Sequence, residues 1–191
     1  MTRIPMTVDA AYLPEWGIQE GLRELVQNWL DACDIDSGAD PEFADGELVL
    51  STRGRLDRGA LLLGCTTKAD DEAQRGQFGE GLKLGALALV RAGCGVTIST
   101  GEERWEARLE CADDFGGRKI LVWYVEEWET DGVEVHVDHL EADAWEACRR
   151  RFRCFADDEE VVACDYHGEL LLAPEQRGHI YVKDILVASD Q

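Results

Sequence analysis

The chain has 191 residues, 45% of them apolar, and its 19 Lys and Arg against 40 Asp and Glu give a formal net charge of −21 at pH 7. This length suffices for one domain with a hydrophobic core, and no stretch approaches the roughly 20 consecutive apolar residues of a membrane span. So acidic a chain repels phosphate backbones, which argues against direct nucleic-acid binding. The N-terminus lacks the apolar run of a secretory signal, so we expect a cytoplasmic protein with no membrane association.

The charge leaves two interpretations open: solvation in a salt-rich cytoplasm, or an acidic surface that docks on a basic partner. The cysteines are easier to interpret. There are seven, none in a C-x-x-C pair, so we expect reduced thiols and no disulfide framework or zinc site.

Apolar periodicity and turn residues predict five segments in the first half of the chain. In chain order they are a helix over 15–33, a loop over 34–46, a strand over 47–52, a short helical stretch over 57–63 and a helix over 82–92. The last of these is almost wholly apolar, so we expect it to be buried.

The second half is dominated by strand-like runs with short connections, which favour antiparallel pairing. We expect strands over 95–100, 104–111, 118–125 and 132–137, a helix over 140–153, and short tail strands over 160–164, 169–172 and 179–187. This order indicates an α+β fold in which helices cover one face of a mostly antiparallel sheet. We expect a single domain over 1–191, with a core over about 12–153 and a C-terminal strand extension over 154–191.

The first chemically informative segment is the helix that contains Glu24, Asn28 and Asp31. At 100° per residue these three side chains share one face, opposite the apolar stripe. An amide oxygen and a carboxylate suit Mg²⁺, which prefers oxygen ligands, and a carboxylate can activate a water for attack on a phosphoryl group. Taken alone, this face is more typical of an ordinary solvated helix than of a metal or nucleotide site.

The second segment is RGQFGEGLK at 75–83, in which three glycines precede the apolar helix. Glycine lets backbone amides approach a ligand closely, and the following helix N-terminus favours phosphate. The segment does not follow the first strand of a βαβ unit, as a dinucleotide fingerprint would, and it lacks the GK[ST] ending of a Walker loop.

Together the two segments resemble the GHKL superfamily of gyrase, heat-shock-chaperone, histidine-kinase and mismatch-repair ATPases. The signature E-x-x-x-N-x-x-D-A is present from Glu24 to Ala32, and G-x-F-G-x-G-x-K from Gly76 to Lys83. GCTTK at 64–68 is similar to the G-x-S-x-K stretch that often precedes the lid in this family. The resemblance covers roughly 12–140 and implies a Bergerat fold, a two-layer α/β sandwich that binds ATP with Mg²⁺.

The resemblance also implies roles for individual residues. Glu24 corresponds to the general base of ATP hydrolysis, and Asn28 to the Mg²⁺ ligand. Asp31 and Ala32 would line the nucleotide pocket, and Lys68 would reach a phosphate or hold the lid. The mobile lid over the phosphates would consist of Gly76, Gln77, Phe78, Gly79, Glu80, Gly81, Leu82 and Lys83.

Two further signatures of the family are altered in this chain. D-x-G-x-G reads TRGRL here, so Thr52 replaces the Asp that accepts the adenine amino hydrogen, and only Gly54 of the two glycines remains. A neutral hydroxyl makes a weaker hydrogen bond than a carboxylate. The family's G-T-x-V reads GVEV, which places Val133 where a hydroxyl normally lies near the base. The tail sequence GHIYVKDILV at 178–187 resembles a strand that follows the ATPase core in some prokaryotic and phage members, whose chains continue beyond it.

Two functions follow as expectations. The first is an ATP- and Mg²⁺-binding domain that acts as a slow ATPase or an ATP-gated conformational switch, with a protein partner or a second protomer. The alternative is a non-hydrolysing acidic interaction or inhibitor module on a degenerate Bergerat scaffold. A phosphotransfer domain like that of histidine kinases is disfavoured, because no helical hairpin with a phospho-accepting His precedes the motifs.

Overall fold

The computed structural model describes residues 1–33, 40–62, 80–155, 161–165, 168–171, 174 and 177–189. The chain forms two compact units, 1–145 and 146–191. The boundary lies within helix α3 (Ala142–Arg149), whereas the sequence suggested a change after residue 153.

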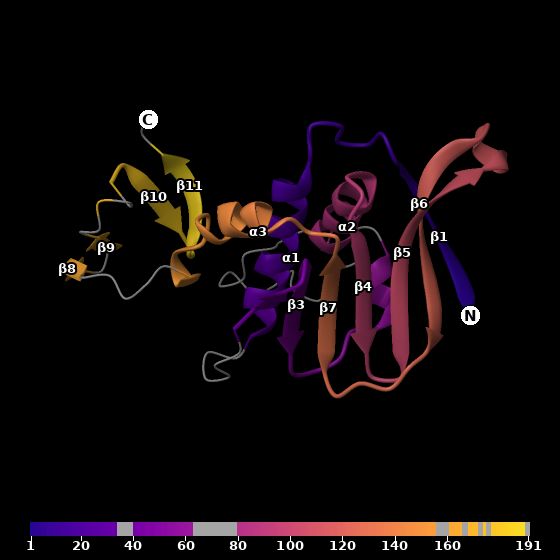
Figure 1. Cartoon of the computed structure of the whole chain (residues 1–191), viewed down its shortest axis with the longest axis horizontal. Coiled ribbons are helices and arrows are strands. Elements are labelled where there is room, and N and C mark those ends of the chain that lie inside the picture. The colour runs from indigo at the N-terminus through magenta and orange to yellow at the C-terminus, as the bar shows by residue number, and fades with distance from the viewer. Residues whose placement is uncertain are drawn as a thin grey trace. The chain divides into compact units, whose positions relative to one another are not determined.

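The first unit is built on a seven-stranded sheet in which every neighbouring pair is antiparallel. The strand order is β1-β6-β5-β4-β7-β3-β2 (Figure 1). The strands are β1 (Thr2–Asp9), β2 (Glu42–Ala44), β3 (Glu47–Thr52), β4 (Gly95–Thr100), β5 (Glu103–Ala112), β6 (Arg118–Glu127) and β7 (Val133–Asp138). An α+β fold with an antiparallel sheet is therefore confirmed, and the four strands expected between 95 and 137 are present.

The two edge strands, β1 and β2, were not predicted from the sequence. Ile4, Met6 and Val8 alternate with polar residues in β1, and Met6 and Val8 are buried. This is the pattern of a strand with one buried face. Pro5 interrupts it, and proline is tolerated in an edge strand because its missing N–H leaves no ladder bond inside the sheet unmade.

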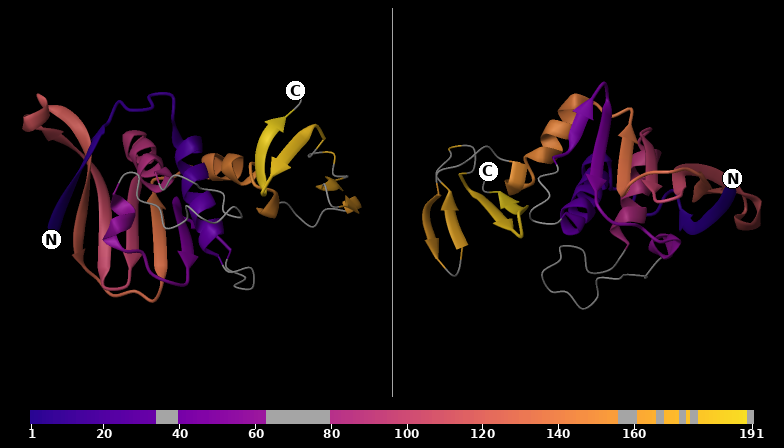
Figure 2. Two further views of the ribbon diagram at one scale, coloured as in Figure 1. Left: turned by 180° about the vertical axis from the view of Figure 1, so that it is seen from behind. Right: turned by 90° about the horizontal axis from the view of Figure 1, so that it is seen from below.

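Helices α1 (Ile18–Ala32) and α2 (Gly81–Arg91) pack against each other and against the sheet. Helix α1 contacts β3, and α2 contacts β4 and β5. The views from behind and from below show both helices on the same face of the sheet (Figure 2). The predicted helices 15–33 and 82–92 are confirmed with slightly different ends.

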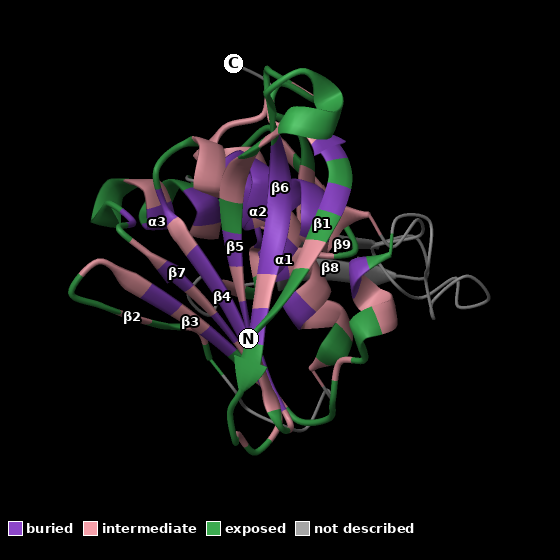
Figure 3. Cartoon of the chain, turned by 90° about the vertical axis from the view of Figure 1, so that its right-hand side faces the viewer, coloured by how far each residue is buried: buried purple, intermediate pink, exposed green. Residues whose placement is uncertain are grey.

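The core of this unit lies between the helices and the sheet. Leu22, Leu25 and Val26 of α1 are at most 2% exposed, and residues 83–89 of α2 are all buried. Figure 3 shows the buried stretches on the helices and on the central strands. The burial expected for the apolar helix is thus confirmed, and its physical reason is the absence of a polar face.

The segment between β1 and α1 is fastened to the end of α2 by one side chain. The guanidinium of Arg91 donates hydrogen bonds of 2.5–2.9 Å to the carbonyls of Ala10, Tyr12, Leu13 and Trp16. A cation in the last turn of a helix also interacts favourably with the helix dipole. Arg91 therefore fixes the chain that leads into α1.

The opposite face of the sheet carries charged side chains that pair with one another. Arg108 makes two bonds of 2.6–2.7 Å to Glu106 of its own strand. Glu110 accepts hydrogen bonds from Tyr124 and, at 2.9 Å, from Arg3 of the edge strand. Cross-strand contacts such as those of Glu110 stabilise a sheet modestly.

The second unit contains two hairpins, β8 (Val161–Asp165) with β9 (Gly168–Leu171), and β10 (His179–Val182) with β11 (Ile185–Ser189). The prediction of one strand over 179–187 was wrong, because the chain turns at Lys183 and Asp184. Both residues have positive φ, 49° and 65°, as a tight two-residue hairpin turn requires.

Candidate functional site

Helices α1 and α2 pack closely through one glycine of each, Gly21 of α1 and Gly85 of α2. A Cβ at Gly21 would come within 2.7 Å of Leu89 Cγ and 2.9 Å of the Gly85 carbonyl oxygen. A Cβ at Gly85 would lie 3.0 Å from the Gly21 carbonyl oxygen and 3.1 Å from Glu24 Cβ. The two helix backbones therefore approach closely, and only glycine leaves room for this contact.

One turn toward the N-terminus of α2, Gly81 lies beside two of the predicted site residues. A Cβ at Gly81 would collide with Oε2 of Glu24 and would lie 3.4 Å from Nδ2 of Asn28. The sequence predicted that Glu24 and Asn28 share a helix face. The structure brings that face to the first residue of the helix that follows the glycine-rich segment.

Asn28 is held in a defined orientation by its own helix. Its Nδ2 donates a 2.7 Å hydrogen bond to the carbonyl oxygen of Glu24, one turn earlier. An amide that donates through nitrogen retains its oxygen as an acceptor or metal ligand. The half-buried Asn28 thus offers Oδ1, the kind of oxygen ligand that Mg²⁺ accepts.

The carboxylate of Glu24 is paired with Arg23, a residue that the sequence analysis did not select. Nη2 of Arg23 lies 2.7 Å from Oε1 of Glu24, and the two side chains are 28% and 16% exposed. The guanidinium also lies over the Trp16 ring, with its carbon 5.7 Å from the ring centroid. A helical wheel separates adjacent residues by 100°, so it gave no reason to pair Arg23 with Glu24.

The first turn of α2 supplies backbone donors beside this carboxylate. The carbonyl of Glu80 accepts from the amides of Lys83 and Leu84 at 3.0–3.1 Å. The amides of Gly81 and Leu82 precede these first helical hydrogen bonds, and such amides at a helix N-terminus favour an anion. The carboxylate of Glu24, the side-chain amide of Asn28 and the N-terminus of α2 therefore meet at Gly81.

Lys83, which was expected to close over phosphates, is held by backbone carbonyls. Its side chain is completely buried, and Nζ donates to the carbonyls of Ala60 and Leu62 at 2.9 and 2.6 Å. These two residues belong to the short helix η1 (Arg58–Leu61) and its C-cap. The lysine thus joins α2 to the segment that follows β3.

The end of β3 forms a second group of predicted site residues. Thr52 is paired with Val133 of β7, and Val133 is 8% exposed. A Cβ at Gly132 would collide with the Thr52 carbonyl oxygen, so this position requires glycine. Gly54 has a φ of +112° and is exposed.

Helix α1 is linked to this second group through Trp29, whose Nε1 donates a 2.9 Å hydrogen bond to the Ser51 carbonyl. Trp29 directly follows Asn28, and Ser51 directly precedes Thr52. Asp31 and Ala32, half-buried and exposed, lie in the last turn of α1. The bond therefore holds the C-terminal half of α1 beside the end of β3.

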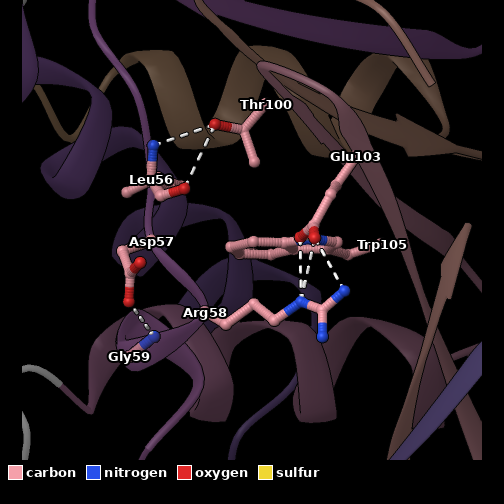
Figure 4. Close-up of polar contacts among 7 residues, drawn as sticks. All are labelled: Leu56, Asp57, Arg58, Gly59, Thr100, Glu103 and Trp105. Atoms are coloured by element: carbon pink, nitrogen blue, oxygen red, sulfur yellow. Dashed lines mark hydrogen bonds and ion pairs between the residues drawn. The ribbon is translucent and has the colours of Figure 1, made fainter. Parts of the chain in front are cut away.

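The segment after β3 is fixed to the β4–β5 hairpin, as Figure 4 shows. Oγ1 of Thr100 accepts from the amide of Leu56 at 2.9 Å and donates to its carbonyl at 3.4 Å. Arg58 forms a bidentate pair with Glu103, and Glu103 also accepts a 2.8 Å hydrogen bond from Nε1 of Trp105. Sequence reasoning gave no sign of this anchor, because its partners are more than 40 residues apart.

The remaining predicted site residues, Lys68, Gly76, Gln77, Phe78 and Gly79, lie outside the described residues. Within the described part of the chain there is no cluster of three or more His, Cys, Asp or Glu side chains that could hold a metal ion. A cation at this site would therefore depend on Asn28, water and ligand oxygens, as is common for Mg²⁺.

No family model and no curated protein matches the chain. Among the helices that the structure describes, none is both long and apolar enough to cross a membrane. Residues 33, 94, 111, 148 and 154 are free cysteines.

Proposed function

We propose that the first unit is a GHKL-type domain with a Bergerat fold that binds ATP together with Mg²⁺. The observation that carries this proposal is the meeting of Glu24 and Asn28 with Gly81. The residues belong to two signatures more than fifty positions apart in the sequence. The antiparallel sheet with α1 and α2 on one face supports the fold part of the proposal.

In this proposal, each side chain has a distinct task. Through Oδ1, Asn28 would hold Mg²⁺, which would supply positive charge beside the phosphate oxygens. The first amides of α2 bind a phosphate oxygen, and Glu24 accepts a proton from the attacking water. Thr52, Gly54, Val133, Asp31 and Ala32 lie around the base. Lys68 and the glycine-rich residues 76–79 also bind the phosphates.

The pairing of Arg23 with Glu24 matters for a ligand as negative as ATP. The chain carries a net charge of −21, and an isolated carboxylate beside the phosphates would repel them. A guanidinium 2.7 Å from Glu24 offsets that repulsion. The carboxylate of Glu24 therefore does not by itself exclude a phosphate group beside it.

Calorimetric titration with ATP, ADP and GTP, each with and without Mg²⁺, tests the proposal. We expect ATP to bind only weakly without Mg²⁺ and to raise the melting temperature when both are present. At a ligand concentration of 100 times Kd, the stabilisation is about 2.7 kcal/mol, or about 5–10 °C for a chain of this size. Absence of both heat and a melting shift with every nucleotide would refute nucleotide binding.

The charge and Thr52 favour a second candidate, a non-hydrolysing acidic module that binds a basic protein. This module predicts no nucleotide effect on melting and a binding affinity for the basic partner that falls steeply with salt. A clear nucleotide-induced melting shift would count against it. Turnover of ATP, measured as phosphate release, separates a slow ATPase from an ATP-gated switch that only binds.

A further inference from the structure

Lys83 is a charged side chain in a fully buried position. It is 0% exposed, and its ammonium donates to two backbone carbonyls, Ala60 at 2.9 Å and Leu62 at 2.6 Å. A buried charge is tolerated when it is hydrogen-bonded, and hydrogen bonds to charged groups are stronger than neutral ones. Two of its three N–H donors are taken by these carbonyls, and because the side chain is fully buried, a phosphate could reach Nζ only if the surrounding chain opened.

The segment that receives Lys83 is anchored at its other end. Asp57 caps η1 by accepting a 2.7 Å hydrogen bond from the amide of Gly59. Arg58 pairs with Glu103 at 2.7 Å, and Leu56 is bonded to Thr100 (Figure 4). Residues 56–62 thus form a strap between the β4–β5 hairpin and the first turn of α2.

Lys83 links the strap to the part of α2 that borders the proposed site. Lys83 is two residues after Gly81, in the first turn of the helix. Gly81 in turn lies against Glu24 and Asn28. The strap therefore holds the first turn of α2 from one side, while Glu24 and Asn28 of α1 lie on the other.

We infer that Lys83 is a positioning residue for the nucleotide site, acting through the strap 56–62 and making no contact with phosphate. The inference rests on the proposed function and deepens it. Loss of the ammonium releases the strap and lets the first turn of α2 shift relative to Glu24 and Asn28. Displacements of about 1 Å by substitutions away from a reacting centre lower rates by up to about 10²-fold.

Hydrogen exchange on the ligand-free protein tests the structural half of the inference. Lys83→Met should accelerate exchange at the amides of Ala60 and Leu62 by about tenfold or more, because the strap opens locally. The matched control is Lys119→Met, which removes an exposed lysine of β6 and should leave these amides unchanged. Unchanged exchange at both amides in Lys83→Met would overturn the inference.

A double-mutant cycle on the Kd for ATP with Mg²⁺ tests the functional half. Glu103→Gln breaks the pair with Arg58 yet keeps an oxygen that accepts from Trp105. We expect Kd to rise about tenfold in Lys83→Met and about threefold in Glu103→Gln, and only about tenfold in the double variant, because both loosen one strap. A rise of about thirtyfold, the product of the two, would indicate independent action and overturn the inference.

The two measurements separate this inference from the proposed function. If the wild-type chain binds no nucleotide, the proposed function fails, and so does the inferred effect of Lys83 on nucleotide binding. Hydrogen exchange still decides whether Lys83 holds the strap. If Lys83→Met does not fold, Glu103→Gln alone decides. Faster exchange at Gly59 and Ala60 with a raised Kd supports the strap, and an unchanged Kd overturns its role in binding.

Discussion

Two Glu–Arg pairs of similar length lie in very different surroundings. On α1, Arg23 and Glu24 are 2.7 Å apart with side chains 28% and 16% exposed. On the outer face of the sheet, Arg108 and Glu106 are 2.6 Å apart but 48% and 45% exposed. The geometry of an ion pair therefore does not distinguish the two regions. Burial and neighbours do, because only Glu24 has a helix N-terminus and an amide side chain beside it.

The outer face shows what such charges do when they pair only with each other. Hydrogen bonds from Arg108 lower the pKa of the Glu106 carboxyl below its usual value. Those from Tyr124 and Arg3 lower the pKa of Glu110, and Glu110 raises the pKa of the Tyr124 hydroxyl. Exposed pairs of this kind contribute little to stability. If the α1–α2 contact is functional and the outer face only structural, substitutions in the two regions should have different effects.

Removal of the α1 carboxylate should have the largest effect. Glu24→Ala should lower the rate of phosphate release from ATP by at least about 10²-fold, since it removes the proposed proton acceptor, while Kd changes by less than about threefold. Glu106→Ala is the matched control, as it removes a carboxylate that is also paired with an arginine. Turnover in Glu24→Ala close to the wild-type rate would eliminate its role as general base.

A larger side chain at Gly21 should disrupt the close contact between α1 and α2. In Gly21→Ala the new Cβ meets the backbone of α2 as well as Leu89, and such overpacking costs about 1–3 kcal/mol. The gain of about 1 kcal/mol in helix propensity offsets part of this cost, so the free energy of unfolding should fall by up to about 2 kcal/mol. Gly17→Ala is the control: its Cβ would have only an ordinary 3.7 Å contact, with Glu20. Urea denaturation of both variants measures the difference, and equal midpoints would contradict the packing argument.

Substitution of Gly81 should affect ligand binding but not stability. In Gly81→Ala the new Cβ displaces the carboxylate of Glu24, a flexible side-chain end. We expect Kd for ATP to rise about tenfold, because both the carboxylate and the first turn of α2 must adjust, while unfolding free energy changes by less than about 1 kcal/mol. Calorimetry and urea denaturation give the two numbers. A loss of stability without a change in Kd would assign Gly81 to packing alone.

The smallest effect is expected on the outer face and depends on pH. Because the pKa of Glu110 is lowered in the folded chain, its stabilisation is present at pH values above its unfolded pKa and is lost as the pH falls through the folded pKa. Glu110→Gln should lower the melting temperature by no more than about 4 °C at pH 6, and the difference should vanish toward about pH 3. A difference that grows as the pH falls would contradict this linkage.

Local sequence patterns were sufficient to predict most helices and strands. The apolar stripe of α1, the apolar run of α2 and the alternating strands from 95 to 137 each carry their own period, and the structure contains all of them. Two errors have local causes. Pro5 hides the alternation in β1, and the turn at Lys183 and Asp184 uses residues other than glycine or asparagine at positive φ, so the tail was predicted as one strand.

The sequence alone determined the α+β class and the shared face of Glu24 and Asn28, since helix geometry depends only on residue spacing. Which partners that face meets was decided by tertiary structure. Gly81 beside Glu24, Arg23 folded onto the same carboxylate and Lys83 buried on Ala60 and Leu62 all depend on how α1, α2 and η1 pack. Side-chain burial and long-range hydrogen bonds arise only when such segments come together, and these contacts have no local pattern from which to predict them.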